Sequence, residues 1–127
     1  GVNERYSRAD VFQGAQGGGF DGNDAWGWRN KGGSLYSLGR YDEAITCYNE
    51  SIRIDPDNPV VWNNKGLAQY RLGRYDEAIL SYEQVIKIDP CDAEAWNNKG
   101  DALNSLGKKD EAKKCHDKSK ELESDEE

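Results

Sequence analysis

The feature that most constrains the fold is a repeat with a period of 34 residues. Trp28, Trp62 and Trp96 are spaced at this interval, and the block LGRYDEAI occurs once in each of the first two periods. Residues 25-58 and 59-92 are identical at 18 of their 34 aligned positions. A sequence with such a period builds one small unit several times, because each unit must bury its apolar side against the next. We therefore expect a stack of similar units.

Residues at fixed offsets within each period indicate the kind of unit. The first period has Trp28, Gly32, Ala44, Tyr48 and Pro56, the second has Trp62, Gly66, Ala78, Tyr82 and Pro90, and the third keeps Trp96, Gly100 and Ala112 but has His116 and Ser124 at the last two places. In this pattern, which covers residues 25 to about 123, the chain resembles the tetratricopeptide repeat family. The resemblance implies an all-α fold, a right-handed α-solenoid of three antiparallel helix-turn-helix repeats. It also implies a concave face lined by the first helix of each pair.

Local signals also predict helical hairpins, independently of the resemblance. Gly39, Gly73 and Gly107 each precede an Asp-Glu-Ala sequence, so one helix is expected to stop at the glycine and the next to begin with acids in its first turn. Asp-Pro pairs end the second helices, because the residue before proline disfavours the α region, and Asn58 and Asp92 are N-cap candidates for the helices that follow. We expect helices near residues 25-38, 42-54, 59-72, 76-88, 93-106 and 110-122.

These helices divide the chain into repeats at residues 25-58, 59-92 and 93-123, followed by an acidic tail at residues 124-127. In the last helix Lys113 and Lys120 stand where both earlier repeats have isoleucine. A helix with lysine at these places can face water, so we expect it to act as a polar cap on the stack.

Residues 1-24 do not repeat and contain a run of glycines. One alternative is that the stretch from Ser7 to Gln13 forms a short helix docked on the first repeat. Another is a flexible, engineered addition, and a third is an extended ligand that lies in a groove through Tyr6, Phe12 and Phe20. The chain has no methionine, which suggests an excised fragment, a processed product or an engineered protein.

Composition excludes several classes of partner. The net charge of -7 opposes binding to phosphate backbones and anionic lipid, so we expect neither nucleic acid nor membrane as a partner. No apolar run reaches the roughly 20 residues that cross a bilayer, and no secretory signal is visible. Three widely spaced cysteines fit a reducing compartment better than a disulfide framework, so a cytoplasmic location is expected.

No set of residues points to catalysis, a metal or a cofactor. His116 follows Cys115 directly, and adjacent residues on a helix point about 100° apart, so these two side chains are not expected to form a nucleophile and base. The glycines from Gly14 to Gly19 lack the Gly-Lys-Ser/Thr of a phosphate loop. We therefore expect no enzyme activity, no metal and no cofactor.

The concave face carries the candidate binding residues. On the first helices, residues that recur one turn apart share the side that faces the groove. The residues expected there are Trp26, Arg29, Asn30, Asn63, Asn64, Tyr70, Arg71, Asn97, Asn98 and Asp101. Amide side chains both donate and accept hydrogen bonds, so this row can bind the backbone of an extended peptide. The alternative is that these positions are merely solvated.

The same family resemblance argues against one kind of ligand. Some tetratricopeptide repeats hold the C-terminal carboxylate of a chaperone tail with basic residues and asparagines. Arg29 and Asn64 match that clamp by residue type, but Gly33, Glu94 and Asn98 stand where Asn, Lys and Arg would be needed. Acidic residues in the third repeat repel a carboxylate, so a neutral or partly basic segment fits better.

The leading hypothesis is a protein-protein interaction module that binds an extended peptide or partner segment in the groove. The alternative is a structural or engineered scaffold that self-associates through the N-terminal segment or the repeat ends.

Overall fold

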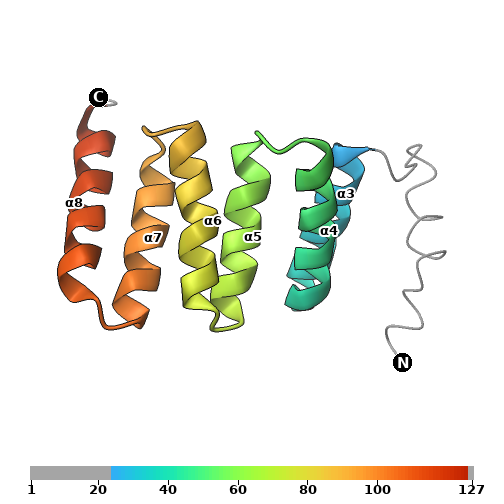
Figure 1. Ribbon diagram of the computed structural model, residues 1–127, viewed down its shortest axis with the longest axis horizontal. Helices are drawn as coiled ribbons and strands as arrows, with labels where there is room; N and C mark the ends of the chain where they lie inside the picture. The colour runs from blue at the N-terminus through green and yellow to red at the C-terminus, as the bar shows by residue number, and fades with distance from the viewer. Residues whose placement is uncertain (1–23, 126–127) are drawn as a thin grey trace. The chain divides into compact units, whose positions relative to one another are not determined.

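A computed structural model describes residues 24–125, and this part of the chain contains six α-helices and no strand (Figure 1). The helices are α3 (Ala25–Ser37), α4 (Tyr41–Ile54), α5 (Pro59–Arg71), α6 (Tyr75–Ile88), α7 (Ala93–Ser105) and α8 (Lys109–Asp125). The all-α helical-repeat fold is therefore confirmed. The alternatives proposed for the N-terminal segment concern residues 1-23 and lie outside the described residues, as do Glu126 and Glu127.

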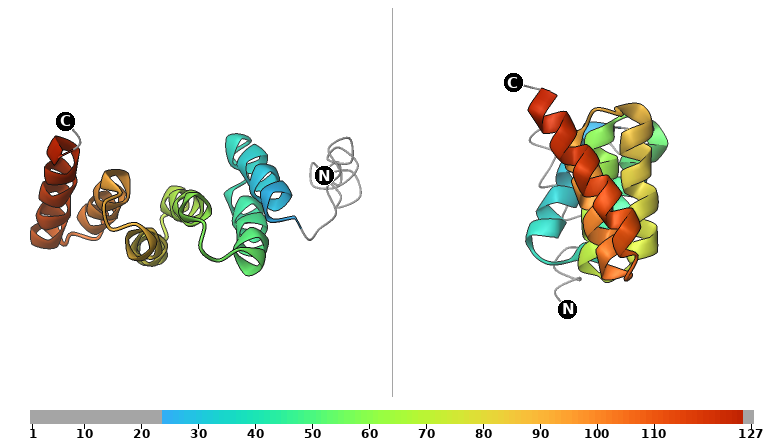
Figure 2. Two further views of the ribbon diagram at one scale, coloured as in Figure 1. Left: turned by 90° about the horizontal axis from the view of Figure 1, so that it is seen from above. Right: turned by 90° about the vertical axis from the view of Figure 1, so that its left-hand side faces the viewer.

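The chain divides into two compact units after Pro56. The first contains the hairpin of α3 and α4, which contact each other along their length. In the second, α5 contacts α6, α6 contacts α7, and α7 contacts α8. Within this unit α5 and α7 lie in one layer and α6 lies in the other (Figure 2, left). The second unit is thus a continuous stack of two hairpins.

Helix ends follow the local signals in the sequence. Asp24, Asn58 and Asp92 cap α3, α5 and α7, each accepting a hydrogen bond from a backbone N–H in the first turn. Such a bond satisfies one of the donors that a helix start leaves unpaired. Gly39 and Gly73 adopt a φ of 78°, a conformation that favours glycine and reverses the chain into the next helix. Apart from α8, the helix bounds fall within one residue of the expected ones.

The last helix is longer than expected. It runs to Asp125, three residues beyond the expected end at 122. No glycine or proline follows Leu122, and the residues there are compatible with a continued helix, so nothing in the sequence stops it. Lys113 and Lys120, which distinguish this helix from α4 and α6, are both exposed. None of the described helices is long and apolar enough to cross a membrane.

Each hairpin is closed by a ring packed on a glycine. A Cβ atom placed on Gly32 would lie 2.6 Å from Cε1 of Tyr48, and one on Gly66 would lie 2.6 Å from Cε1 of Tyr82. Both rings are buried. The two helices therefore approach more closely than any side chain at the glycine would permit, which offsets the unfavourable helix propensity of glycine.

The core of the middle repeat is more polar than that of its neighbours. Buried Ser81 donates a hydrogen bond of 2.7 Å to Oε1 of buried Gln69, between α6 and α5. The first and third repeats have a leucine and a cysteine at these two places, which are buried in both repeats: Leu35 with Cys47, and Leu103 with Cys115. A buried polar pair of this kind is tolerated because each group satisfies the other.

The repeated tryptophans are only partly core residues. Trp28 is buried, with 4% of its surface exposed, whereas Trp62 and Trp96 are half-buried. The indole N–H of Trp96 donates to the carbonyl oxygen of Pro90 at 2.9 Å. In the third repeat Lys99 Nζ lies 5.6 Å from the ring centre of Trp96, and the same pairing occurs in the other two repeats. The lysine one turn later thus covers part of each ring.

Candidate functional site

The expected groove residues of the first unit all lie on α3. Trp26 is 62% exposed, Asn30 is exposed and Arg29 is half-buried. A tryptophan so exposed contributes little to the core and leaves a large apolar surface for contact with another molecule. The described part of the first unit is a single hairpin, so these three residues form a patch on one helix.

The second unit carries the other seven expected residues on α5 and α7, and none of them is buried. Four of them are half-buried: Asn63, Asn64, Tyr70 and Asn98. The other three are exposed: Arg71, Asn97 and Asp101. Side chains with this intermediate exposure are held in place by neighbours while still presenting polar atoms to solvent. The set is therefore accessible as a whole.

Three polar contacts join α7 to the preceding hairpin. Asn98 Nδ2 donates to Asn63 Oδ1 at 3.1 Å, Tyr70 and Ser105 share a hydrogen bond of 3.4 Å between their hydroxyls, and Lys99 pairs with Glu83 of α6 at 3.1 Å. The structure thus brings Asn63 and Asn98 together, as a bridge between repeats. It leaves the other expected asparagines of this unit, Asn64 and Asn97, outside that bridge.

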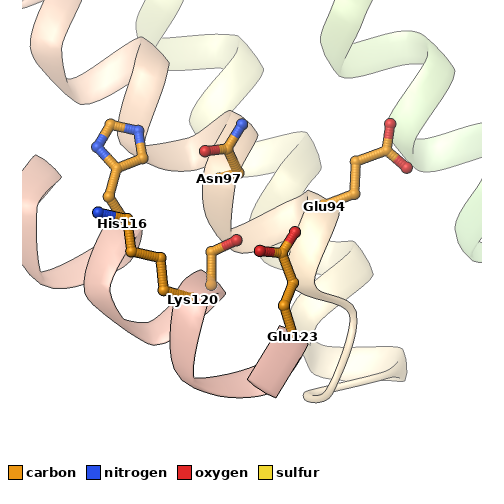
Figure 3. A pocket seen from close by; sticks show the side chains of 6 residues that line it. Glu94, Asn97, His116, Lys120 and Glu123 are labelled. Carbon is orange, nitrogen blue, oxygen red and sulfur yellow. The ribbon is translucent and has the colours of Figure 1, made fainter. Parts of the chain in front are cut away.

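A hollow lies between α7 and α8, with a volume of about 580 Å³ (Figure 3). It is lined by Glu94, Asn97, His116, Ser119, Lys120 and Glu123. Ser119 donates its hydroxyl proton to the carbonyl oxygen of Ala93 at 2.8 Å, which joins the start of α7 to α8. The hollow contains both signs of charge, with two carboxylates and one ammonium group, so it can accept a polar or charged group by hydrogen bonding and ion pairing.

His116 connects this hollow to the expected groove. Its Nε2 lies 3.0 Å from Oδ1 of Asp101, a residue of the predicted binding face. The imidazole also packs on Gly100, where a Cβ would lie 2.6 Å from Nε2. From the sequence, His116 was weighed as a possible base only against its neighbour Cys115, although its position in the repeat was recognised. The signal that identifies its role is its place in the repeat, which is that of Tyr48 and Tyr82.

Cys115 does not cooperate with His116. Cys115 is buried against Leu103 and Ala112, and burial raises the pKa of its thiol, which disfavours the nucleophilic thiolate. His116 points instead to Asp101, as expected for adjacent residues on a helix. None of the three cysteines, all of which lie in the described part of the chain, forms a disulfide. Among residues 24–125 there is also no group of three or more potential metal ligands.

Comparison with protein families gives a consistent result along the repeats. Three models of the tetratricopeptide repeat match the chain in tandem, at residues 32–73, 59–90 and 81–114. No curated protein sequence matches the chain.

Solved structures of similar fold include one of MamA, at 26% identity and a TM-score of 0.82, with 84% of this chain and 62% of that chain covered. The chain thus spans less than two thirds of that structure. The first repeat domain of Spaghetti (RPAP3), bound to the HSP90 peptide SRMEEVD, is 33% identical with a TM-score of 0.77, covering 82% of each chain. The second domain of the same protein, also bound to this peptide, is 30% identical with a TM-score of 0.74, covering 77% of this chain and 91% of that one.

Proposed function

The chain belongs to the tetratricopeptide-repeat family, and from this membership we propose that it is a protein-interaction module that binds an extended segment of a partner protein. The proposed site is the face of α5 and α7 in the second unit. Its role is binding, not catalysis. Two related domains hold the peptide SRMEEVD, which supports a ligand of this general kind.

The observation that carries the proposal is the row of amides on α5 and α7. Asn63 and Asn98 are bonded to each other across two repeats, which fixes the spacing of the two helices. Asn64 is half-buried and Asn97 is exposed beside this bridge, so each can offer both a donor and an acceptor. An extended peptide has backbone N–H and C=O groups that need such partners.

Charge on the third repeat favours a neutral or basic segment. Glu94 and Asp101 are both exposed on α7, and the position of Glu94 would have to carry a lysine to hold a terminal carboxylate. Asn98 donates its amide N–H to Asn63, at the place where an arginine would be needed. The ligand of this chain is therefore proposed to differ in charge from SRMEEVD, because like charges repel at an interface.

A peptide array tests the proposal. The full chain is applied to short peptides of varied charge, among them SRMEEVD and the same peptide with both glutamates replaced by lysine. We expect the lysine peptide to bind more tightly than SRMEEVD. For the best binder of the array, the double variant Asn64→Ala with Asn97→Ala should weaken binding by roughly tenfold or more, since two amide contacts of about 1 kcal/mol each are lost.

A matched control uses the opposite side of the second unit. Leu80 is 63% exposed on α6, and Leu80→Ala should leave binding unchanged. If the asparagine double variant bound the selected peptide as well as the parent chain, the assignment of the site to this face would be wrong. If no peptide bound at all, the proposal of an extended ligand would be wrong as well.

A further inference from the structure

The way α7 docks on the second repeat defines a pattern of contacts. On α7, Asn98 bonds to Asn63 and Lys99 pairs with Glu83. Ala102 packs in a cluster with Ala78 and Tyr82, and Ser105 bonds to Tyr70. The pattern thus consists of an amide pair, an ion pair, a small residue against a ring, and a pair of polar side chains. It can be compared directly with the two ends of the chain, because the repeats have a fixed length.

The residues of α3 that lie two repeats before the four docking residues of α7 occupy equivalent positions. The residues at the four places are Asn30, Lys31, Ser34 and Ser37. The residues that α7 contacts in the second repeat have equivalents one repeat later, on α7 and α8. These equivalents are Asn97, Asp117, the pair of Ala112 and His116, and Asn104. Each contact therefore has a counterpart of the same chemistry: amide with amide, lysine with carboxylate, small residue with ring, and serine with a polar side chain.

Most residues of these two faces are exposed in the described part of the chain. Asn30, Ser34 and Ser37 are exposed on α3. Asn97, Asn104 and Asp117 are exposed on the other face, and the hollow between α7 and α8 lies beside Asn97 and His116 (Figure 3). In the second repeat the corresponding place is occupied, because α7 packs on α6 there.

We propose that the chain associates head to tail, with α3 of one copy seated on the α7–α8 face of the next copy. Lys31 would pair with Asp117 while its ammonium lies 4.9 Å from the ring centre of Trp28, just as Lys99 pairs with Glu83 while lying over Trp96. Asp117 Oδ2 is 2.9 Å from Nζ of Lys113. Its carboxylate has a second oxygen that can accept from Lys31.

Such a contact uses two different faces of the same chain, so it does not close on itself and can extend from copy to copy. Lys113 and Lys120 replace the isoleucines that flank the same position in the second repeat. The face is therefore polar, and the association is reversible and depends on concentration. It shares Asn97 with the proposed peptide site, but Ser34→Arg changes only α3 and leaves the asparagines of α5 and α7 intact, so the two proposals can fail independently.

The primary test is the concentration dependence of the mass of the full chain, measured by light scattering and sedimentation from micromolar to millimolar concentrations. The average mass should rise steadily without levelling at a dimer. Ser34→Arg places a bulky side chain where the small residue must meet His116, and should keep the chain monomeric. Thr46→Arg is the control, because Thr46 is exposed on α4 and a basic residue, Lys114, occupies the same place in the third repeat. Circular dichroism checks that both variants fold.

A charge swap identifies the interface itself. Lys31→Glu and Asp117→Lys each set like charges against each other, and each should weaken association roughly fivefold. An equal mixture of the two variants should regain much of the association of the parent chain, since each contact between one variant and the other joins opposite charges. A parent chain that stays monomeric at millimolar concentration overturns the proposal. It is also overturned if Ser34→Arg associates like the parent or if the mixture shows no recovery.

Discussion

Two adjacent glycines on α3 should respond in opposite ways to the same substitution. Alanine is favoured over glycine within a helix by about 0.5 to 1 kcal/mol. At Gly33 a Cβ would have nothing within 4 Å, so Gly33→Ala should stabilise the protein by that amount. At Gly32 the Cβ would lie 2.6 Å and 2.8 Å from two ring atoms of Tyr48. Only 1% of Tyr48 is exposed, so its ring cannot swing into solvent.

The net effect at Gly32 follows from two opposing terms. Overpacking a buried site costs about 1 to 3 kcal/mol, and the gain in helix propensity offsets about 0.5 to 1 kcal/mol of it. Gly32→Ala should therefore destabilise the protein by up to about 2.5 kcal/mol. Because the propensity term is common to both variants, the difference between them, about 1 to 3 kcal/mol, measures the close packing alone.

Urea unfolding followed by circular dichroism gives both values, provided that the dependence on urea is the same in the parent and the variants. In a Tyr48→Leu background the ring is absent, and the penalty of Gly32→Ala should largely disappear. If Gly32→Ala stabilised the parent as much as Gly33→Ala does, the glycine would not be there for close approach of α3 and α4.

Two further predictions concern buried polar groups. In the middle repeat, Gln69→Leu or Ser81→Cys alone should lower the free energy of unfolding by about 1 to 3 kcal/mol, because each leaves a buried partner unpaired. The double variant should recover most of this loss, and a double-mutant cycle of unfolding free energies measures the recovery. Burial raises the pKa of the Tyr48 hydroxyl from 10.0 to about 12, so ionisation favours the unfolded chain between these values. As the pH rises from about 10 to about 12, the free energy of unfolding of the parent should fall by about 2 to 3 kcal/mol relative to that of Tyr48→Phe. Below about pH 10 the difference between the two proteins should not change with pH. Parallel curves of unfolding free energy against pH from about 10 to about 12 would contradict the prediction.

Helix positions could be predicted from the sequence because their determinants are local. Gly39 and Gly73 need only a left-handed backbone, and Asn58 and Asp92 need only a nearby N–H, so a few neighbouring residues decide where each helix begins or ends. The repeat period then indicated which residues lie on the same face. These inferences required no knowledge of distant contacts.

The hydrogen-bond partners could not be predicted in the same way. Asn98 was expected to face an extended ligand, but the structure also bonds its amide to Asn63, 35 residues away. His116 was judged against its sequence neighbour, whereas its contact is with Asp101, 15 residues earlier. Both partners depend on how two helices are packed and rotated, which composition and spacing do not specify. The half-burial of Trp62 and Trp96 has the same origin.

The pair of Gln69 and Ser81 has a consequence for how the repeats find one another during folding. Chains built from similar units tend to misassemble by exchanging equivalent segments. If α5 closed on α8 instead of α6, Gln69 would face Cys115, and its amide would lose a partner at a cost of about 1 to 3 kcal/mol. An exchange between the first and third repeats meets no such penalty, because both present leucine and cysteine. The polar pair therefore disfavours misassembled forms in which a helix of the middle hairpin pairs with a helix of either neighbouring repeat.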